Sequence, residues 1–138
     1  RLTDWQDDTK RRAANTCYAE TWLGRRRYII GILSTDWGKR SFAERCAMNT
    51  PIQGTAADIL KLAMGRIVAG IKERPWLKPF LQIHDELVFE IPADKLDEAV
   101  GFVKACMEVQ PFPAFDVPII AEAAYGESFG ELKEMEGV

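Results

Sequence analysis

Residues Leu81 to Glu90 read LQIHDELVFE, and this stretch decides how the rest of the chain is interpreted. Apolar residues on both sides of a central polar triplet predict the two strands of a hairpin. The triplet is His84, Asp85 and Glu86, and His84 is the only histidine in the chain. Burying a carboxylate without a partner is costly, so we expect the two acids at an exposed tip where a cation meets them.

A divalent metal ion is the natural partner for such a pair of acids. Mg²⁺ prefers carboxylate oxygen and retains several waters, so one or two carboxylates on a rigid turn are the usual share that a protein supplies. Asp85 and Glu86 therefore predict a Mg²⁺ site and, through it, a phosphate group. The alternative is a solvated hairpin turn, in which Asp is common. Phosphohydrolases that hold their ions with several histidines are excluded by the single histidine.

Composition limits the class of protein. The 138 residues, of which 47% are hydrophobic, fit one domain with one sizeable core. The net charge of -3 argues against a general nucleic-acid coat but is compatible with a local basic patch. No apolar run approaches the roughly 20 residues of a membrane span, and we expect a soluble, cytoplasmic setting with no membrane partner. The cysteines Cys17, Cys46 and Cys106 are far apart and are expected to be buried or half-buried rather than disulfide-bonded.

Helical patterns occupy both sides of the hairpin. Residues 9–21 and 94–107 combine helix formers with one apolar face and predict helices. Residues 24–33 (GRRRYIIGIL) and 117–126 (VPIIAEAAYG) predict strands or extended segments. The class expected is therefore α+β, with an antiparallel sheet and the hairpin packed against helices.

The long helical pattern before the hairpin contains signals of a restart. Ser41 with an acid three residues later has the form of a capping box, and Thr50 before Pro51 resembles an N-cap with proline at the first helical position. We expect two helices, or one broken near Pro51, ended by Pro75 and Pro79. A core-facing stripe recurs at spacings of three and four: Ile52, Ala56, Ile59, Leu60, Ala63, Ile67 and Ile71.

Polar side chains recur at regular steps along the same pattern. Arg45, Asn49 and Gln53 are each four residues apart, so they would align on one side of a straight helix. Arg, Asn and Gln are the side chains that hydrogen-bond base edges and sugars, although a solvated helix face is the simpler interpretation. The basic triplet that begins with Arg25 and Arg26 is suited to phosphates, but by itself it is a weak signal.

Together these stretches resemble one known family. In chain order, TWLGRRRY, AERCAMNTPIQGTAADILKLAM, LQIHDELVFE and VPIIAEAAYGE resemble the C-terminal palm region of family A DNA polymerases, the bacterial DNA polymerase I type. The resemblance runs from about Cys17 to Phe129, and LQIHDELVFE resembles that family's motif C. It implies that residues 1–138 form a single C-terminal palm segment whose antiparallel sheet is of the palm type.

The resemblance implies a catalytic role for the hairpin tip. Asp85 would bind the catalytic Mg²⁺ ions, Glu86 would lie beside the primer terminus as the second acid of the site, and His84 would contact the terminal primer nucleotide. The reaction implied is transfer of a deoxynucleotide from its triphosphate to a primer 3′-hydroxyl. Two metal ions would activate the hydroxyl and hold the triphosphate, and Asp85 would supply one of the two essential carboxylates.

The resemblance also implies contacts with primer–template DNA. Arg45, Asn49 and Gln53 would face the duplex, with the last two on its minor-groove side, where acceptors occur on every base pair. Arg25 and Arg26 are assigned to DNA binding with them.

Two parts of the family pattern are missing from these residues. The family's motif A strand carries the other metal-binding aspartate, and its motif B helix carries a lysine and an aromatic residue that bind the nucleotide. Neither stretch occurs in residues 1–138. We therefore expect that the chain alone does not extend primers and that its partner is the remainder of the polymerase. A smaller departure is Phe129, where the family often has Trp.

Three functional hypotheses follow. The chain is a piece of an intact polymerase, one half of a split polymerase, or a non-catalytic module that binds duplex DNA; a first residue of Arg1 rather than Met favours the piece. Because the motif A strand belongs to the palm sheet, we expect an uncovered edge beside the hairpin and self-association of the isolated chain.

Overall fold

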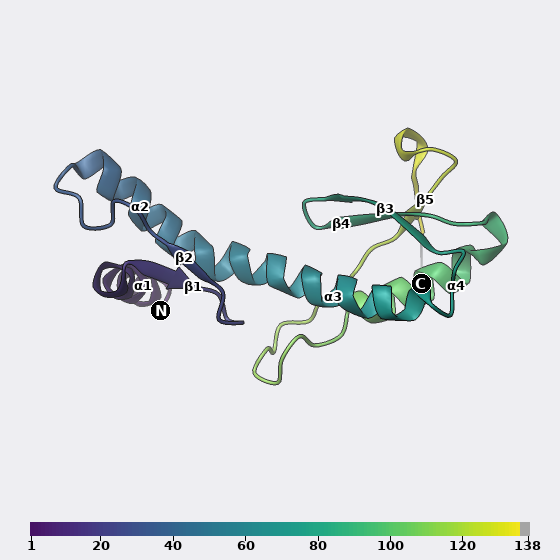
Figure 1. The fold of residues 1–138 in the computed structure, drawn as a ribbon, viewed down its shortest axis with the longest axis horizontal. Coiled ribbons are helices and arrows are strands. Elements are labelled where there is room, and N and C mark those ends of the chain that lie inside the picture. Colours follow the sequence, from purple (N-terminus) through teal and green to yellow (C-terminus); the bar gives the residue numbers. More distant parts are fainter. Residues whose placement is uncertain (136–138) are drawn as a thin grey trace. The chain divides into compact units, whose positions relative to one another are not determined.

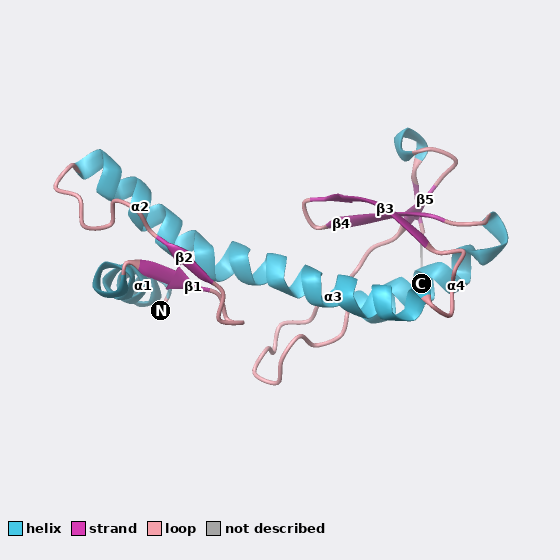
Figure 2. Cartoon of the chain, viewed as in Figure 1, coloured by secondary structure: helices cyan, strands magenta, loops and turns pink. Residues whose placement is uncertain are grey.

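A computed structural model describes residues 1–135 of the chain. The chain divides into two compact units, Arg1–Asp58 and Ile59–Val138. The described residues combine helices and strands, which Figure 2 distinguishes by colour. The strands form three two-stranded antiparallel sheets. The predicted α+β class is therefore confirmed. The expectation of one core is wrong, because the buried apolar residues form two separate clusters.

The first unit packs two helices against a short hairpin. Its elements are α1 (Leu2–Thr16), β1 (Tyr18–Glu20), β2 (Arg26–Tyr28), α2 (Trp37–Asn49), η1 (Thr50–Gly54) and the start of α3 (Thr55–Ile71), and Figure 1 labels its α-helices and strands. Strands β1 and β2 pair with Ala19 opposite Arg27. The core cluster consists of Ala13, Ala19, Ile29, Ile32, Ala43 and Ala47. Since four of these six residues are alanines, the backbones of these elements approach one another closely.

The first helix and strand of this unit differ from their predicted ranges. Helix α1 begins at Leu2 instead of residue 9 and ends at Thr16. It stops there because Cys17 takes a left-handed φ of 60°, and its N–H donates to the carbonyl of Ala13. The strand expected over residues 24–33 is limited to β2, and Gly31, with a φ of 88°, turns the chain shortly after it.

Helix α2 begins five residues earlier than the capping box predicted. Asp36 is its N-cap, and the Asp36 side chain accepts a hydrogen bond from the backbone N–H of Lys39 at 3.0 Å. Ser41 lies inside the helix, so the predicted capping box is wrong. Both residues satisfy the N-cap pattern, but only Asp36 has an extended backbone, with φ -70° and ψ 117°, next to the unpaired first amides of the helix.

The predicted restart at Pro51 is a π-helical turn. Thr50 has helical backbone angles, φ -61° and ψ -46°, so it is not an N-cap. Its hydroxyl donates instead to the carbonyl of Cys46 at 2.7 Å. Residues Thr50–Gly54 form η1, and α3 follows without a loop. The wider turn accommodates the proline, which has no N–H to donate into a regular α-helical ladder.

The second unit places a hairpin on two helices. After α3 its elements are β3 (Lys78–Ile83), β4 (Glu86–Glu90), η2 (Ala93–Lys95), α4 (Leu96–Met107), β5 (Ala124–Tyr125), η3 (Phe129–Glu131) and β6 (Lys133–Glu134). The buried residues Ile67, Leu77 and Ala99 form its core, and Leu87 and Phe89 of β4 pack against them. Figure 1 shows the hairpin beside α4. The prediction of a hairpin packed against helices is therefore confirmed.

Two prolines that were predicted to end the long helix lie beyond its end. Helix α3 ends at Ile71, well before Pro75, and Pro79 lies inside β3 rather than at a helix end. The register of the hairpin shifts between Pro79 and Leu81, which indicates a β-bulge. Proline has no N–H to donate to a neighbouring strand, so it is tolerated at such a bulge at the edge of a sheet. The strand expected over residues 117–126 is reduced to β5.

The predicted core stripe of the long helix holds only in its second half. Leu60, Ala63 and Ile67 are buried, as expected. Ile52 is 61% exposed and Ala56 is exposed as well, so the first two members of the stripe are wrong. In this part of the helix the buried side chains are the polar Thr50, Thr55 and Asp58.

The cysteines and the helices bear on two expectations drawn from composition. All three cysteines are free, but Cys17 is exposed, contrary to expectation, whereas Cys46 and Cys106 are half-buried. Burial raises the pKa of the Cys106 thiol. Among residues 1–135, no helix has the length and apolar character required to cross a membrane.

Candidate functional site

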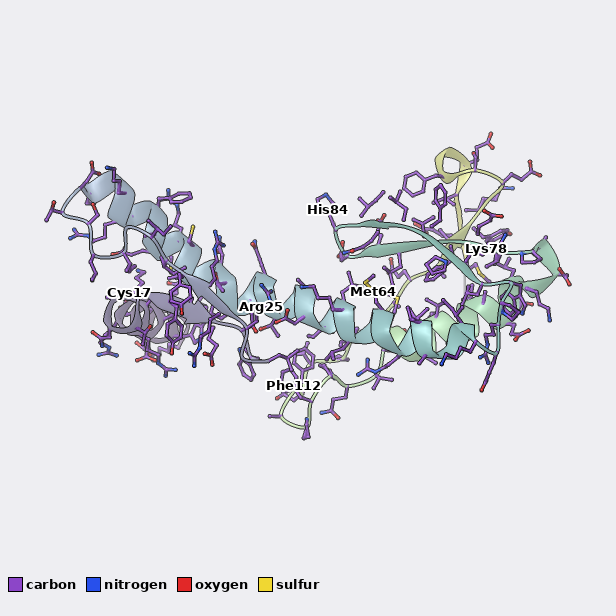
Figure 3. All side chains as sticks on the ribbon, in the orientation of Figure 1. Cys17, Arg25, Met64, Lys78, His84 and Phe112 are labelled. Carbon is purple, nitrogen blue, oxygen red and sulfur yellow. The ribbon has the colours of Figure 1, made fainter. Side chains whose placement is uncertain are left out.

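The tip of the β3–β4 hairpin presents the polar triplet to solvent. Ile83 pairs with Glu86, so the connecting turn contains only His84 and Asp85, and Glu86 is the first residue of β4. His84 has a φ of 53°, the left-handed region used by the favoured two-residue turns of hairpins. Its carbonyl accepts a hydrogen bond from Nε2 of Gln82 at 3.2 Å. Figure 3 labels His84 at this end of the hairpin.

The two acids of the tip fit part of a metal site. Asp85 and Glu86 are both exposed, and neither carboxylate forms an ion pair within the described part of the chain. Adjacent, unpaired carboxylates on a short turn match the share of ligands that a protein usually gives to Mg²⁺. Residues 1–135 contain no group of three or more His, Cys, Asp or Glu side chains able to hold an ion.

The backbone of His84 gives a testable requirement for the turn. His84→Val is expected to lower the free energy of unfolding by about 1–2 kcal/mol, because a β-branched residue resists the left-handed region. His84→Asn is the matched control: it removes the imidazole but tolerates this conformation, so its stability should stay within about 0.5 kcal/mol of the wild type. Urea unfolding followed by circular dichroism measures both. Equal stability of the two variants would contradict the assignment of strain to residue 84.

A second group of predicted residues lies on the long helix. Arg45 on α2, Asn49 at its end and Gln53 in η1 are all exposed. Steps of four residues drift by about 40° around a regular α-helix, which has 3.6 residues per turn. The wider π turn between Asn49 and Gln53 offsets this drift, so the row stays on one side. We call these three residues the polar row.

Members of the polar row are fixed to different extents. Nη1 of Arg45 donates to the hydroxyl of Ser41 at 3.0 Å, and the Arg45 guanidinium lies 5.9 Å from the ring centroid of Phe42. The polar row belongs to the first unit, whereas the hairpin tip belongs to the second.

Two arginines of the basic triplet are held by acids. Nε of Arg25 lies 2.7 Å from Oδ1 of Asp58, and Nε of Arg26 lies 2.7 Å from Oε2 of Glu20. The hydrogen bond with Glu20 raises the pKa of Arg26, whose guanidinium also lies 4.6 Å from the ring centroid of Tyr18. The side chains of Arg25 and Arg26 are still 47% and 55% exposed, so each retains surface for a further contact.

Sequence reasoning did not foresee the role of Asp58. This carboxylate is buried at 8% exposure, although it lies within a pattern that was interpreted as an apolar stripe. Its partners come from about thirty residues earlier in the chain, at Thr21 and Arg25. A charged residue inside an apolar helical stripe was the available signal, because a buried carboxylate requires such partners.

Comparisons with known proteins identify the family. Residues 1–131 match the family described as DNA polymerase family A, and the chain belongs to this family. It is 42% identical over 135 residues to the DNA polymerase I, thermostable, of Thermus filiformis. It is also 42% identical over 130 residues to the DNA polymerase I of Bacillus subtilis. These matches cover 94% of this chain but only 15% and 14% of the two relatives.

A solved structure supports the same relationship. The POL domain of Pol1 from M. smegmatis, in complex with DNA primer-template and dNTP, matches with a TM-score of 0.77 and 39% sequence identity. The match covers 85% of this chain and 20% of that chain. The resemblance inferred from the sequence is therefore confirmed at the level of family and fold.

Proposed function

We propose that this chain forms part of a DNA-directed DNA polymerase and supplies motif C to template-directed DNA synthesis. The observation that carries the proposal is the two-residue turn that exposes Asp85 beside Glu86 in a chain of family A. The structural neighbour is a complex with primer–template DNA and dNTP, which supports the same two partners for this chain.

The hairpin tip is the proposed catalytic contribution. Asp85 and Glu86 would hold Mg²⁺, which when bound supplies charge stabilisation to an in-line displacement at the α-phosphorus. The fold of the second unit positions these two carboxylates. The two-residue turn fixes the backbone of Asp85, and Leu87 and Phe89 anchor β4 on the core of its unit. His84 would contact the terminal nucleotide of the primer.

The polar row is the proposed contact surface for the duplex. Minor-groove acceptors occur on every base pair, so Asn49 and Gln53 can test base-pair geometry without selecting a sequence. Arg45 and Arg26 would add positive charge for the backbone of the DNA. The sequence predicts Arg25 for the same surface as well, but two of its nitrogens already donate to groups within the protein.

We further propose that the remainder of the polymerase, with motifs A and B, completes the site. Strand β3 supports this proposal, because five of its six residues are exposed and Phe80 and Leu81 are 73% and 45% exposed. An exposed apolar strand with an unpaired edge is a surface that proteins usually cover. In the isolated chain, self-association would cover the same edge.

Reconstitution tests the proposal. The chain alone is expected to show no primer extension, because the second metal-binding aspartate and the nucleotide-binding helix are missing. A chimera in which residues 1–138 replace the matching segment of the Bacillus subtilis relative is expected to extend a primer in the presence of Mg²⁺ and the four dNTPs. The relative with that segment deleted is the control.

Three outcomes would change the conclusion. Extension by the chain alone that is lost in Asp85→Ala would show that the site is complete without motifs A and B. Incorporation after mixing the chain with a separate polypeptide that bears both motifs would identify a split polymerase. A duplex affinity without activity in either arrangement would identify a non-catalytic DNA-binding module.

A further inference from the structure

A buried polar network joins the β1–β2 loop to the start of α3 within the first unit. The two carboxylate oxygens of Asp58 accept from different donors: Oδ2 from the hydroxyl of Thr21 and Oδ1 from Nε of Arg25, each at 2.7 Å. Nη2 of Arg25 donates to the carbonyl of Gly54 at 3.1 Å. One guanidinium therefore contacts both the end of η1 and the first turn of α3. Figure 3 labels Arg25 beside the long helix.

Two threonines tie the loop backbone to the same place. The hydroxyl of Thr21 accepts from the backbone N–H of Arg25 at 3.1 Å, and the hydroxyl of Thr55 accepts from the backbone N–H of Trp22 at 3.0 Å. Thr21 and Thr55 are only 4% and 5% exposed. Since buried polar groups are costly unless all are paired, the network forms or fails as a unit.

The loop and the helix also approach closely at Gly54. A Cβ atom at position 54 would lie 2.7 Å from Cγ2 of Thr21 and 3.4 Å from Nη2 of Arg25. The first distance is shorter than van der Waals contact allows, so any residue larger than glycine would push the loop away. Gly54 directly follows Gln53, the last member of the polar row.

We propose that Arg25 is a positioning residue for the polar row and is not a phosphate ligand. It acts through the Asp58 carboxylate and the Gly54 carbonyl, which fix the π turn that presents Gln53. A phosphate would have to compete with a carboxylate that is 8% exposed and that would lose its cationic partner. This inference rests on the proposed function, because it assumes that the polar row faces DNA.

The salt dependence of duplex binding separates the two roles. In the chimera, Arg25→Gln is expected to weaken binding of a fluorescent primer–template about tenfold without changing the slope of log K against log salt concentration. Each phosphate ligand contributes about 0.9 to that slope, so a slope reduced by this amount would overturn the inference. Unchanged affinity would overturn it as well. Arg26→Gln is the matched comparison on the neighbouring residue, measured by the same anisotropy titration.

Asp58→Asn provides an independent test, because the two roles of Arg25 predict different directions of change in duplex affinity. If Arg25 were a phosphate ligand, removal of the Asp58 charge would release it, and duplex affinity would rise or stay constant. As a positioning residue, Arg25 loses its anchor, so Asp58→Asn is expected to weaken binding about as much as Arg25→Gln. The double variant should bind no more weakly than either single variant, because both remove the same network. Additive losses would contradict this.

A rescue experiment keeps the test decisive if Arg25→Gln prevents folding. Gly54→Ala is expected to weaken duplex binding about tenfold, because the new methyl group meets Cγ2 of Thr21. Thr21→Ser removes that methyl group and keeps the hydroxyl, so the Thr21→Ser, Gly54→Ala pair should recover most of the affinity. Full affinity in Gly54→Ala alone, or no recovery in the pair, would overturn the inference.

The same chimera distinguishes this inference from the proposed function. A wild-type chimera that neither binds primer–template nor extends it would remove the proposed function. A wild-type chimera that extends the primer, together with a reduced salt slope for Arg25→Gln, would remove only the positioning role of Arg25.

Discussion

Asp85→Ala is expected to reduce nucleotide incorporation by the chimera about a thousandfold or more. A metal ion contributes several kcal/mol of charge stabilisation in such reactions, and each 1.36 kcal/mol corresponds to about a tenfold change in rate. Asp85 lies in the turn and is exposed, so its carboxylate is available for an ion rather than for the core. Single-turnover incorporation of one nucleotide at saturating dNTP measures the effect on the chemical step.

Two controls restrict the interpretation of that loss. Asp94→Ala removes another exposed acid of the same unit and is expected to leave the rate within about twofold of the wild type. Asp85→Asn keeps the size of the side chain and removes its charge, so it should lose nearly as much activity as Asp85→Ala. Incorporation that survives in both Asp85 variants would contradict a role in metal binding.

Ile67→Ala is expected to lower the free energy of unfolding by about 3 kcal/mol, because it leaves a cavity in a packed core. Ile67 is 2% exposed and belongs to the cluster formed with Leu77 and Ala99. The matched control is Val68→Ala on the next residue of α3, which is 60% exposed and should change the free energy by about 0.5 kcal/mol or less. Urea unfolding of the chain, followed by circular dichroism, measures both.

Ile67→Ala and Val68→Ala are well matched, because the two residues share a helix and differ mainly in burial. If Ile67→Ala and Val68→Ala were equally stable, α3 would not pack on the hairpin and α4 as described. A loss confined to Ile67→Ala would establish that the β3–β4 hairpin packs on this core. Such a stability change is separable from catalysis, since neither residue belongs to the hairpin tip.

The hairpin could be predicted from sequence because its determinants are local. Apolar residues lie on both sides of the turn, and a polar pair at the turn separates the two strands. The long helix was predicted only in part, because the spacing of apolar residues reveals a buried helix face only where that face is apolar. Around Asp58 the buried face is polar and depends on Thr21 and Arg25, which no window of the helix contains.

Local signals also failed where two residues competed for one role. Asp36 and Ser41 both fit the N-cap pattern, and only the backbone conformation distinguishes them, because Asp36 is extended and Ser41 lies inside the helix. Pro51 is compatible both with a helix start and with a π turn, so sequence alone could not distinguish a restart from a continuous helix. The family could be inferred because the hairpin motif and the helical stretch before it occur together in one order.

The π turn has a consequence for insertions and deletions. It is equivalent to one extra residue in an otherwise regular helix. Deleting a single residue of η1 would restore the α-helical period, because four α-helical residues cover nearly the same angle around the axis as five residues of a π turn. The helix on either side would keep its phase, so Asp58 would still face Arg25. The chain between Asn49 and Thr55 can therefore lose one residue without rotating α3, whereas loss of a second residue would rotate α3 by about 100° relative to α2.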